Sequence, residues 1–301
     1  MKISTKLSII ALALLTGACG SGTSNPAPSG SGTISLKLTD SPIDNAKKVV
    51  VEFIGVEFRS SSADSIVTFD FAARSIDLLD LQGFTTTTLL DNQSLPVGEY
   101  DEIRLKINAD EDGELDSFIE LSDGSQHELK IPSGTSSGLK IKGNLTIVEN
   151  STGNFTVDFD VRRSIVVAGN SGKYLLKPVL RLTEDKESGN ITGLVDASLL
   201  NADTCFDDDP VTDNAVYVFE GSVTPDDIDS SSDLDVEPVV TALLDDSFHY
   251  TAAFLMAGEY TIAFTCNAGE ENIDTDNDLM FSGTSTATVI AGETKTVDLT
   301  L

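Results

Sequence analysis

The sequence predicts an all-β protein made of two consecutive antiparallel β-sandwich domains after an exported leader and a flexible tether. Apolar residues alternate with polar ones along many short segments, which is the period of a strand with one buried face. Turn residues such as the "DEDG" of 110–113 and the "AGNSG" of 168–172 separate these segments at short intervals. The best helical candidates are two short pieces, 42–46 and 85–90.

The first sandwich is expected over residues 33–188. In 155–161 the apolar residues alternate with Asp158 and Asp160, so we expect these two carboxylates on a solvated face, as in antiparallel sheets. In 49–58 the alternation slips by one residue across Gly55, which predicts a β-bulge.

The second sandwich is expected over residues 189–301, where the alternating pattern returns. The segments "LPVGEYDEIRLKI" (95–107) and "FLMAGEYTIAFTC" (254–266) both place Gly-Glu-Tyr before an alternating strand. We therefore expect Tyr100 and Tyr260 to pack their rings and to bond their hydroxyls to the backbone, much as in a tyrosine corner.

The N-terminus carries an export signal. Residues 1–18 combine two lysines with an apolar run too short to span a bilayer, so they are interpreted as a signal peptide. The stretch Leu15–Cys19 resembles a bacterial lipobox, although Thr16 stands where leucine is usual. That resemblance implies a lipidated Cys19, and Gly20 in place of an aspartate favours the outer membrane. An ordinary secretory signal with a chance cysteine is the alternative.

Residues 19–32 are rich in Ser, Gly and Pro, which predicts a flexible tether between lipid and domain.

Five segments of the first module occur in the order found in the bacterial domain-of-unknown-function 4382 family: "LTDSPID" (38–44), "IDLLDLQG" (76–83), "LPVGEYDEIRLKI" (95–107), "FTVDFDVRRSIVVAG" (155–169) and "YLLKPVLRL" (174–182). Residues 33–185 therefore resemble that family. The resemblance implies an exported β-sandwich, often lipid-anchored, and no particular activity. Residues 189–301 more loosely resemble a carboxypeptidase-regulatory or prealbumin-like sandwich, a group of folds that includes carbohydrate-binding members.

Charge divides the chain. The protein has 49 acidic and 19 basic residues, a net charge of −30. Residues 33–188 hold 26 acids and 16 bases (−10), whereas residues 189–301 hold 23 acids and one base, Lys295 (−22). Such a surface repels phosphate backbones, so nucleic acid is excluded as a partner. Alternatively, the negative charge serves only to keep the protein soluble, or it is an adaptation to a salty medium in which the repulsion between charges is screened.

Two cysteines remain beside Cys19. In an exported chain Cys205 and Cys266 are expected to form a disulfide, and two buried free thiols are the alternative.

Calcium is the one cofactor that the sequence suggests. Asp274, Asp276 and Asp278 alternate in "DTDNDL" (274–279), a spacing that lets a loop wrap several oxygens around one ion. Leu279 stands where an EF-hand needs glycine, so this is not an EF-hand. A solvated acidic loop is the alternative.

Catalytic motifs are missing from the sequence. Its two histidines, His127 and His249, have no nucleophile motif nearby, and His249 is expected to face solvent. We therefore expect a non-enzymatic lipoprotein of the cell envelope, a binding or structural module with membrane contact through Cys19 and a protein or glycan partner. Carbohydrate binding by the second sandwich is the alternative function. The chain has no Trp, and Tyr174, Tyr217 and Tyr250 are the candidate stacking rings, of which Tyr217 and Tyr250 belong to the second sandwich.

Overall fold

The computed structural model describes residues 30–41, 46–61, 65–132, 138–201, 205, 213–229, 236–271, 273, 275 and 279–301. These residues form a nearly all-β protein with four sheets, which confirms the predicted fold class. Two sheets draw their strands from residues 31–184 and are called the first sandwich. The other two draw theirs from residues 188–296 and are called the second sandwich.

The smaller sheet of the first sandwich has the order β12-β9-β1-β4. Its strands are β1 (Ser31–Ser41), β4 (Thr87–Pro96), β9 (Thr152–Asp160) and β12 (Leu180–Glu184). Alternate residues of β1, namely Ile34, Leu36 and Leu38, are fully buried, as a period of two requires. β1 pairs with β9 in parallel and with β4 antiparallel, so the N-terminal strand lies inside its sheet.

The larger sheet has the order β10-β11-β7-β6-β2-β5-β8, and β3 pairs with β2 outside this path. Its strands are β2 (Ala46–Ser60), β3 (Ile66–Asp77), β5 (Gly98–Asn108), β6 (Phe118–Leu121), β7 (Gln126–Lys130), β8 (Leu139–Ile147), β10 (Ile165–Val167) and β11 (Tyr174–Leu176). One continuous hydrophobic core, from Ile34 to Leu176, lies between the two sheets.

The second sandwich has its own cores. One sheet has the order β16-β13-β19 and the other β15-β14-β17-β18. Their strands are β13 (Ser188–Leu194), β14 (Ala215–Glu220), β15 (Val240–Leu243), β16 (His249–Met256), β17 (Gly258–Thr265), β18 (Ser282–Val289) and β19 (Thr294–Thr296). Its buried apolar residues form one cluster between Ile191 and Leu299 and a second around Tyr217 and Phe219.

Among the described residues, helical structure is confined to single turns. These are α1 (Val161–Ser164), α2 (Ala197–Leu200) and the 3-10 turns η1 (Leu78–Leu81), η3 (Gly169–Ser171), η4 (Asp185–Glu187) and η6 (Ala268–Glu270). Among the described residues no helix is long and apolar enough to cross a membrane.

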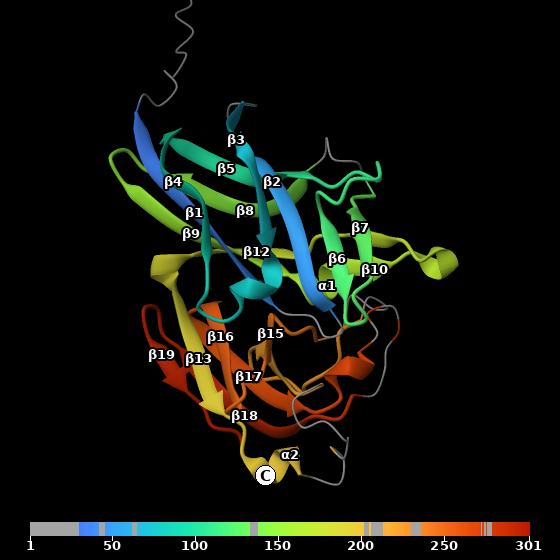
Figure 1. The fold of residues 1–301 in the computed structure, drawn as a ribbon. Coiled ribbons are helices and arrows are strands. Elements are labelled where there is room, and N and C mark those ends of the chain that lie inside the picture. Colours follow the sequence, from blue (N-terminus) through green and yellow to red (C-terminus); the bar gives the residue numbers. More distant parts are fainter. Residues whose placement is uncertain are drawn as a thin grey trace, which may run out of the picture.

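The two sandwiches lie end to end. In Figure 1 the first sandwich fills the upper half and the second the lower half, and the start of β1 lies at the end away from the second sandwich. The chain crosses from one to the other between β12 and β13 through η4.

Several local predictions are confirmed. Tyr100 donates its hydroxyl hydrogen bond to the Pro96 carbonyl and Tyr260 donates to the Met256 carbonyl, each at 2.8 Å and four residues back. Both Gly-Glu-Tyr segments therefore build the same corner, one in each sandwich. The register of β2 shifts between Phe53 and Gly55 against both β3 and β5, which is the expected bulge.

Two expectations differ from the structure. Three of the four sheets are mixed, because β1–β9, β7–β11 and β13–β19 pair in parallel. The described strand pairs of the β15-β14-β17-β18 sheet are all antiparallel, as expected. The helical candidate at 85–90 is wrong: β4 begins at Thr87, and its Leu89 and Leu90 are buried against the core. The other helical candidate was 42–46. Residues 42–45 lie outside the described residues, and Ala46 belongs to β2.

Candidate functional site

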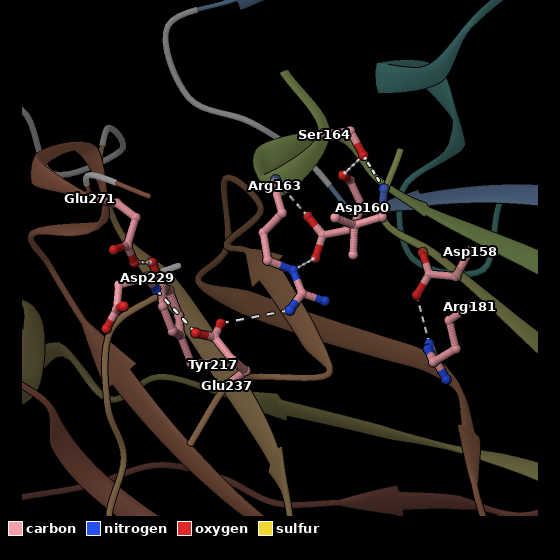
Figure 2. A network of polar contacts seen from close by, with 10 residues as sticks. Asp158, Asp160, Arg163, Ser164, Arg181, Tyr217, Asp229, Glu237 and Glu271 are labelled. Atoms are coloured by element: carbon pink, nitrogen blue, oxygen red, sulfur yellow. Dashed lines mark hydrogen bonds and ion pairs between the residues drawn. The ribbon is translucent and has the colours of Figure 1, made fainter. Parts of the chain in front are cut away.

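The site begins where β9 ends and the chain makes the single turn α1. The Asp160 carboxylate accepts hydrogen bonds from the Arg163 backbone N–H (3.0 Å) and from Arg163 Nε (2.7 Å), so it caps this turn. The Ser164 hydroxyl donates to the Asp160 carbonyl and accepts from the Val179 N–H at 2.9 Å. These contacts, drawn in Figure 2, fix the turn that carries Arg162 and Arg163.

Three arginines of the first sandwich reach the second. Arg162 Nη1 donates to the Ala268 carbonyl at 2.9 Å, and Arg181 Nη1 donates to the Phe254 carbonyl at 2.7 Å. Arg163 Nη1 lies 3.7 Å from Glu237 Oε2.

The acceptors come from three separate segments of the second sandwich, which has one basic residue of its own. The arginines therefore bring cations to a strongly anionic domain, and we call this contact the junction.

Asp158 is the buried partner of Arg181. Its Oδ2 accepts a hydrogen bond from Arg181 Nη2 at 2.6 Å, and the residue is 5% exposed. Burial raises the pKa of Asp158, and the positive charge of Arg181 opposes that rise. Asp158 and Asp160 thus do not face solvent as expected. Asp158 borders a cavity whose other wall is the second sandwich, and Asp160 is bonded to Arg163.

Asp40 at the end of β1 is the least satisfied polar group of the junction. Among the described residues, neither of its buried carboxylate oxygens has a hydrogen-bond partner. Burial raises the pKa of Asp40 well above its ordinary value, and the negative charges of Asp158 and Asp160 raise it further. A carboxyl group in this position favours its neutral form, since the Val161 backbone N–H lowers the pKa of Asp40 less than burial and the two neighbouring carboxylates raise it.

Replacing Asp40 by Asn is expected to stabilise the protein more at pH 8 than at pH 4. An acid whose folded-state pKa is raised contributes most to stability below its unfolded-state pKa, and this contribution is lost as the pH rises through the folded-state pKa. The expected gain at pH 8 is on the order of 1–3 kcal/mol in the free energy of unfolding, measured by urea denaturation at both pH values. Asp101→Asn, an exposed position on β5, is the control and should change neither value. A pH dependence identical in Asp40→Asn and wild type would contradict the assignment.

The second sandwich contributes two partly buried carboxylates to the same network. Glu271 accepts a hydrogen bond from the Tyr217 hydroxyl (2.7 Å) and another from the Ile228 N–H (3.1 Å). Glu237 accepts from the Asp229 N–H at 3.1 Å. Burial is the main cause that raises the pKa of both glutamates. The positive charge of Arg162 opposes the rise at Glu271, and that of Arg163 opposes the rise at Glu237.

Two hollows border the junction. A cavity of about 190 Å³ lies between Asp40 and Asp158 on one side and the 240–245 segment with His249 on the other. A wider groove of about 670 Å³ is mostly apolar and is bordered by Ile131, Leu176 and Ile228, with Arg163 and Glu237 among its charged residues. The junction can therefore fix the two sandwiches against each other, with one hollow beside Asp158 and Phe254 and the other beside Arg163 and Glu237.

The structure describes some of the site residues predicted from the sequence and leaves others outside the described residues. Cys205 and Cys266 form the expected disulfide. Cys19, Asp274, Asp276 and Asp278 lie outside the described residues. Within the described ranges no group of three or more His, Cys, Asp or Glu side chains is arranged to hold a metal ion. His249 is exposed as expected, with its Nδ1 3.7 Å from Asp245.

The candidate stacking rings of the second sandwich are buried. Tyr217 and Tyr250 are at most 1% exposed, and Tyr250 donates its hydroxyl hydrogen bond to the Val297 carbonyl at 2.6 Å. Neither ring can form a platform for a sugar. Tyr174 is partly exposed.

The comparison with protein families bears on the first sandwich. Residues 31–178 match the family model described as "Domain of unknown function (DUF4382)". The matched region holds β1 to β11 and the turn with Arg162 and Arg163, and it ends just before β12. This agrees with the resemblance drawn from the sequence motifs. The relationship of residues 189–301 to carboxypeptidase-regulatory or prealbumin-like sandwiches stays a prediction.

No curated protein is significantly similar to the chain. Among solved structures, the chain is similar to the TIE protein of Bacillus anthracis (11% identity, 90% of this chain and 34% of that one, TM-score 0.21). It is also similar to a leucine-rich repeat protein of Bacteroides thetaiotaomicron (14% identity, 91% of this chain and 26% of that one, TM-score 0.21). A third similar structure is a minor pilin of Streptococcus agalactiae (12% identity, 88% of this chain and 94% of that one, TM-score 0.20). The chain spans about a third of the first and a quarter of the second, and at these scores the similarities carry no argument about function.

Proposed function

We propose that the protein is a non-enzymatic module of the cell envelope, tethered through an acylated Cys19, whose first sandwich holds the acidic second sandwich away from the membrane. The observation that carries this proposal is the junction: Arg162, Arg163 and Arg181 bind three segments of the second sandwich at one end of the first. β1 runs from Ser31 to the junction at Asp40. At about 3.3 Å per residue, its start lies roughly 30 Å from the junction.

This arrangement suits presentation of a surface. A lipid on Cys19 would hold the end of the first sandwich where β1 begins, and the second sandwich would be the part that meets partners. With 23 acids against one base, that domain would attract basic proteins or cations and repel other anionic surfaces. The partner class that we propose is therefore a basic protein or matrix component.

Changing Cys19 to Ser is expected to release the protein from the membrane fraction. The diacylglycerol-bearing sulfur would be lost, and a folded domain without an anchor partitions into the aqueous phase. The measurement is fractionation of cells together with incorporation of labelled palmitate into wild type and variant. Ser21→Ala, two residues further on, is the control and should remain in the membrane. A variant Cys19→Ser that stays in the membrane and carries label would contradict the anchor.

Calcium at Asp274, Asp276 and Asp278 is a further part of this proposal, and it rests on the sequence spacing alone. Millimolar calcium is expected to raise the melting temperature of the full chain by a few degrees, at fixed ionic strength, whereas magnesium should not. The double variant Asp276→Asn, Asp278→Asn should remove the rise. An equal response to both ions, or a rise that survives in the variant, would show that these aspartates hold no selective site.

A further inference from the structure

A separate hollow of about 280 Å³ lies on the first sandwich, among β7, β11 and the 110–116 loop. Its lining includes His127, Tyr174, Leu115, Glu111, Lys130 and Lys173. Leu115 is 45% exposed, an apolar side chain open to solvent at the rim. This hollow shares no lining residue with the junction cavity or with the apolar groove.

The aromatic side of the hollow is a pair of rings. β7 and β11 run in parallel with Tyr174 opposite Leu129, which brings Tyr174 next to His127. The ring centroids lie 4.9 Å apart with 39° between the planes, and both residues are partly exposed. The other four tyrosines are occupied: Tyr100 and Tyr260 form corners, and Tyr217 and Tyr250 are buried. Within the part of the chain that the structure describes, Tyr174 is thus the tyrosine whose ring borders an open hollow and whose hydroxyl forms no hydrogen bond.

The polar side of the hollow is held in place before any ligand arrives. Glu111 accepts a hydrogen bond from Lys130 at 3.1 Å and another from Lys173. These two lysines lower the pKa of Glu111, so its carboxylate stays ionised. Glu128 accepts from the Gly113 N–H at 2.7 Å and so ties the 110–116 loop to β7.

The charges of this hollow balance. Glu111 and Glu128 offset Lys130 and Lys173, in a protein whose net charge is otherwise strongly negative. A free anion would meet the carboxylates of Glu111 and Glu128 beside the lysines, and a cation would meet the two ammonium groups. The hollow therefore favours a neutral ligand with many hydroxyl groups over either kind of ion.

We propose that this hollow binds the ring of a neutral sugar. Its Tyr174–His127 pair and Leu115 offer an apolar surface for the C–H face of a pyranose, and Glu111, Lys130 and Lys173 offer fixed acceptors and donors to the hydroxyl groups. An aromatic wall with a few convergent polar groups is the usual composition of a small-molecule site. This proposal names a ligand class for the binding module proposed above, and it rests on that proposed function.

The test is saturation-transfer NMR of the full chain in detergent with glucose, galactose, N-acetylglucosamine and glucuronate at millimolar concentration. We expect at least one neutral sugar to bind. Tyr174→Ala should weaken binding by about tenfold or more, as loss of an anchoring aromatic does. Tyr174→Phe should retain it because the ring remains. Lys173→Met, at an exposed position, should weaken binding severalfold without affecting the fold.

Phe84→Ala is the matched control, because Phe84 is an aromatic residue 54% exposed elsewhere on the first sandwich, and it should bind as wild type does. The proposal is overturned if no neutral sugar binds, if glucuronate alone binds, or if Tyr174→Ala and Lys173→Met both bind as wild type does. Because binding is measured on purified protein, such a failure would leave the anchor and the junction untouched. A failure of the Cys19 experiment would likewise leave this site standing.

Discussion

Replacing Arg181 by Met is expected to lower the free energy of unfolding by about 3–5 kcal/mol, the usual result of removing one partner from a buried ion pair. Arg181 serves both sandwiches, since it donates to the Asp158 carboxylate at 2.6 Å and to the Phe254 carbonyl at 2.7 Å. Methionine keeps the length of the side chain but leaves Asp158 buried, ionisable and without its cation. The measurement is urea denaturation of the full chain at pH 7.

A second substitution separates charge from packing in this prediction. Asp158→Asn in the Arg181→Met background should recover about half of the loss, because no uncompensated charge remains buried. Lys186→Met is the control: Lys186 pairs with Glu184 at 2.7 Å, but its side chain is 71% exposed, so its loss should change stability by no more than about 1 kcal/mol. Equal effects of Arg181→Met and Lys186→Met would show that the buried pair does not hold the junction.

Breaking the disulfide between Cys205 and Cys266 is expected to lower the free energy of unfolding by roughly 4 kcal/mol. The two cysteines are 61 residues apart, and the cross-link restricts the unfolded chain over that whole loop. Cys266 follows the end of β17 and packs in the main core of the second sandwich, so the link ties Cys205 to that core. The double variant Cys205→Ser, Cys266→Ser is compared with wild type by urea denaturation.

Reduction of the wild-type protein provides the control for this second prediction. Wild type with reductant should behave as the double variant does, and reductant should leave the double variant unchanged. A difference of less than about 1 kcal/mol between oxidised and reduced wild type would contradict the prediction, because it would mean that the loop is already restricted without the link.

Local patterns in the sequence predicted local structure well. The bulge at Gly55 and the corners of Tyr100 and Tyr260 depend on residues close together in the chain, and the structure has all three. The cysteine pairing followed from the small number of cysteines in a chain that is expected to be exported. Each of these features is decided by a few neighbouring side chains or by elimination.

Local sequence patterns could not predict the junction between the two sandwiches. Asp158 and Asp160 alternate with apolar residues as solvent-facing residues do, but both are buried, and Asp158 borders a cavity whose other wall is the second sandwich. The parallel pairing of β1 with β9 joins residues more than a hundred positions apart, which no short period reveals. The pair of arginines in "VRRS" (161–164) was the one available signal, since two adjacent cations beside an acidic domain predict a contact.

The burial of Tyr217 and Tyr250 has a similar cause. Strand alternation assigns a residue to one of two faces, but it does not say whether another layer covers that face. In β14 all residues from Ala215 to Phe219 are buried, because cores lie on both sides of the strand. A run of consecutive apolar residues such as "AVYVF" (215–219) is typical of such a doubly covered strand.

The position of β1 determines how the protein resists force. A pull on a lipid at Cys19 would act along β1, which is hydrogen-bonded to β9 from Thr33 to Ser41 and to β4 from Ser31 to Leu38. The inter-strand bonds lie across the direction of such a pull, so they would be loaded together in shear and not opened one at a time. If the chain is anchored through Cys19 as proposed, the anchor would therefore pull on a central strand, and the sandwich would resist through two rows of inter-strand bonds at once.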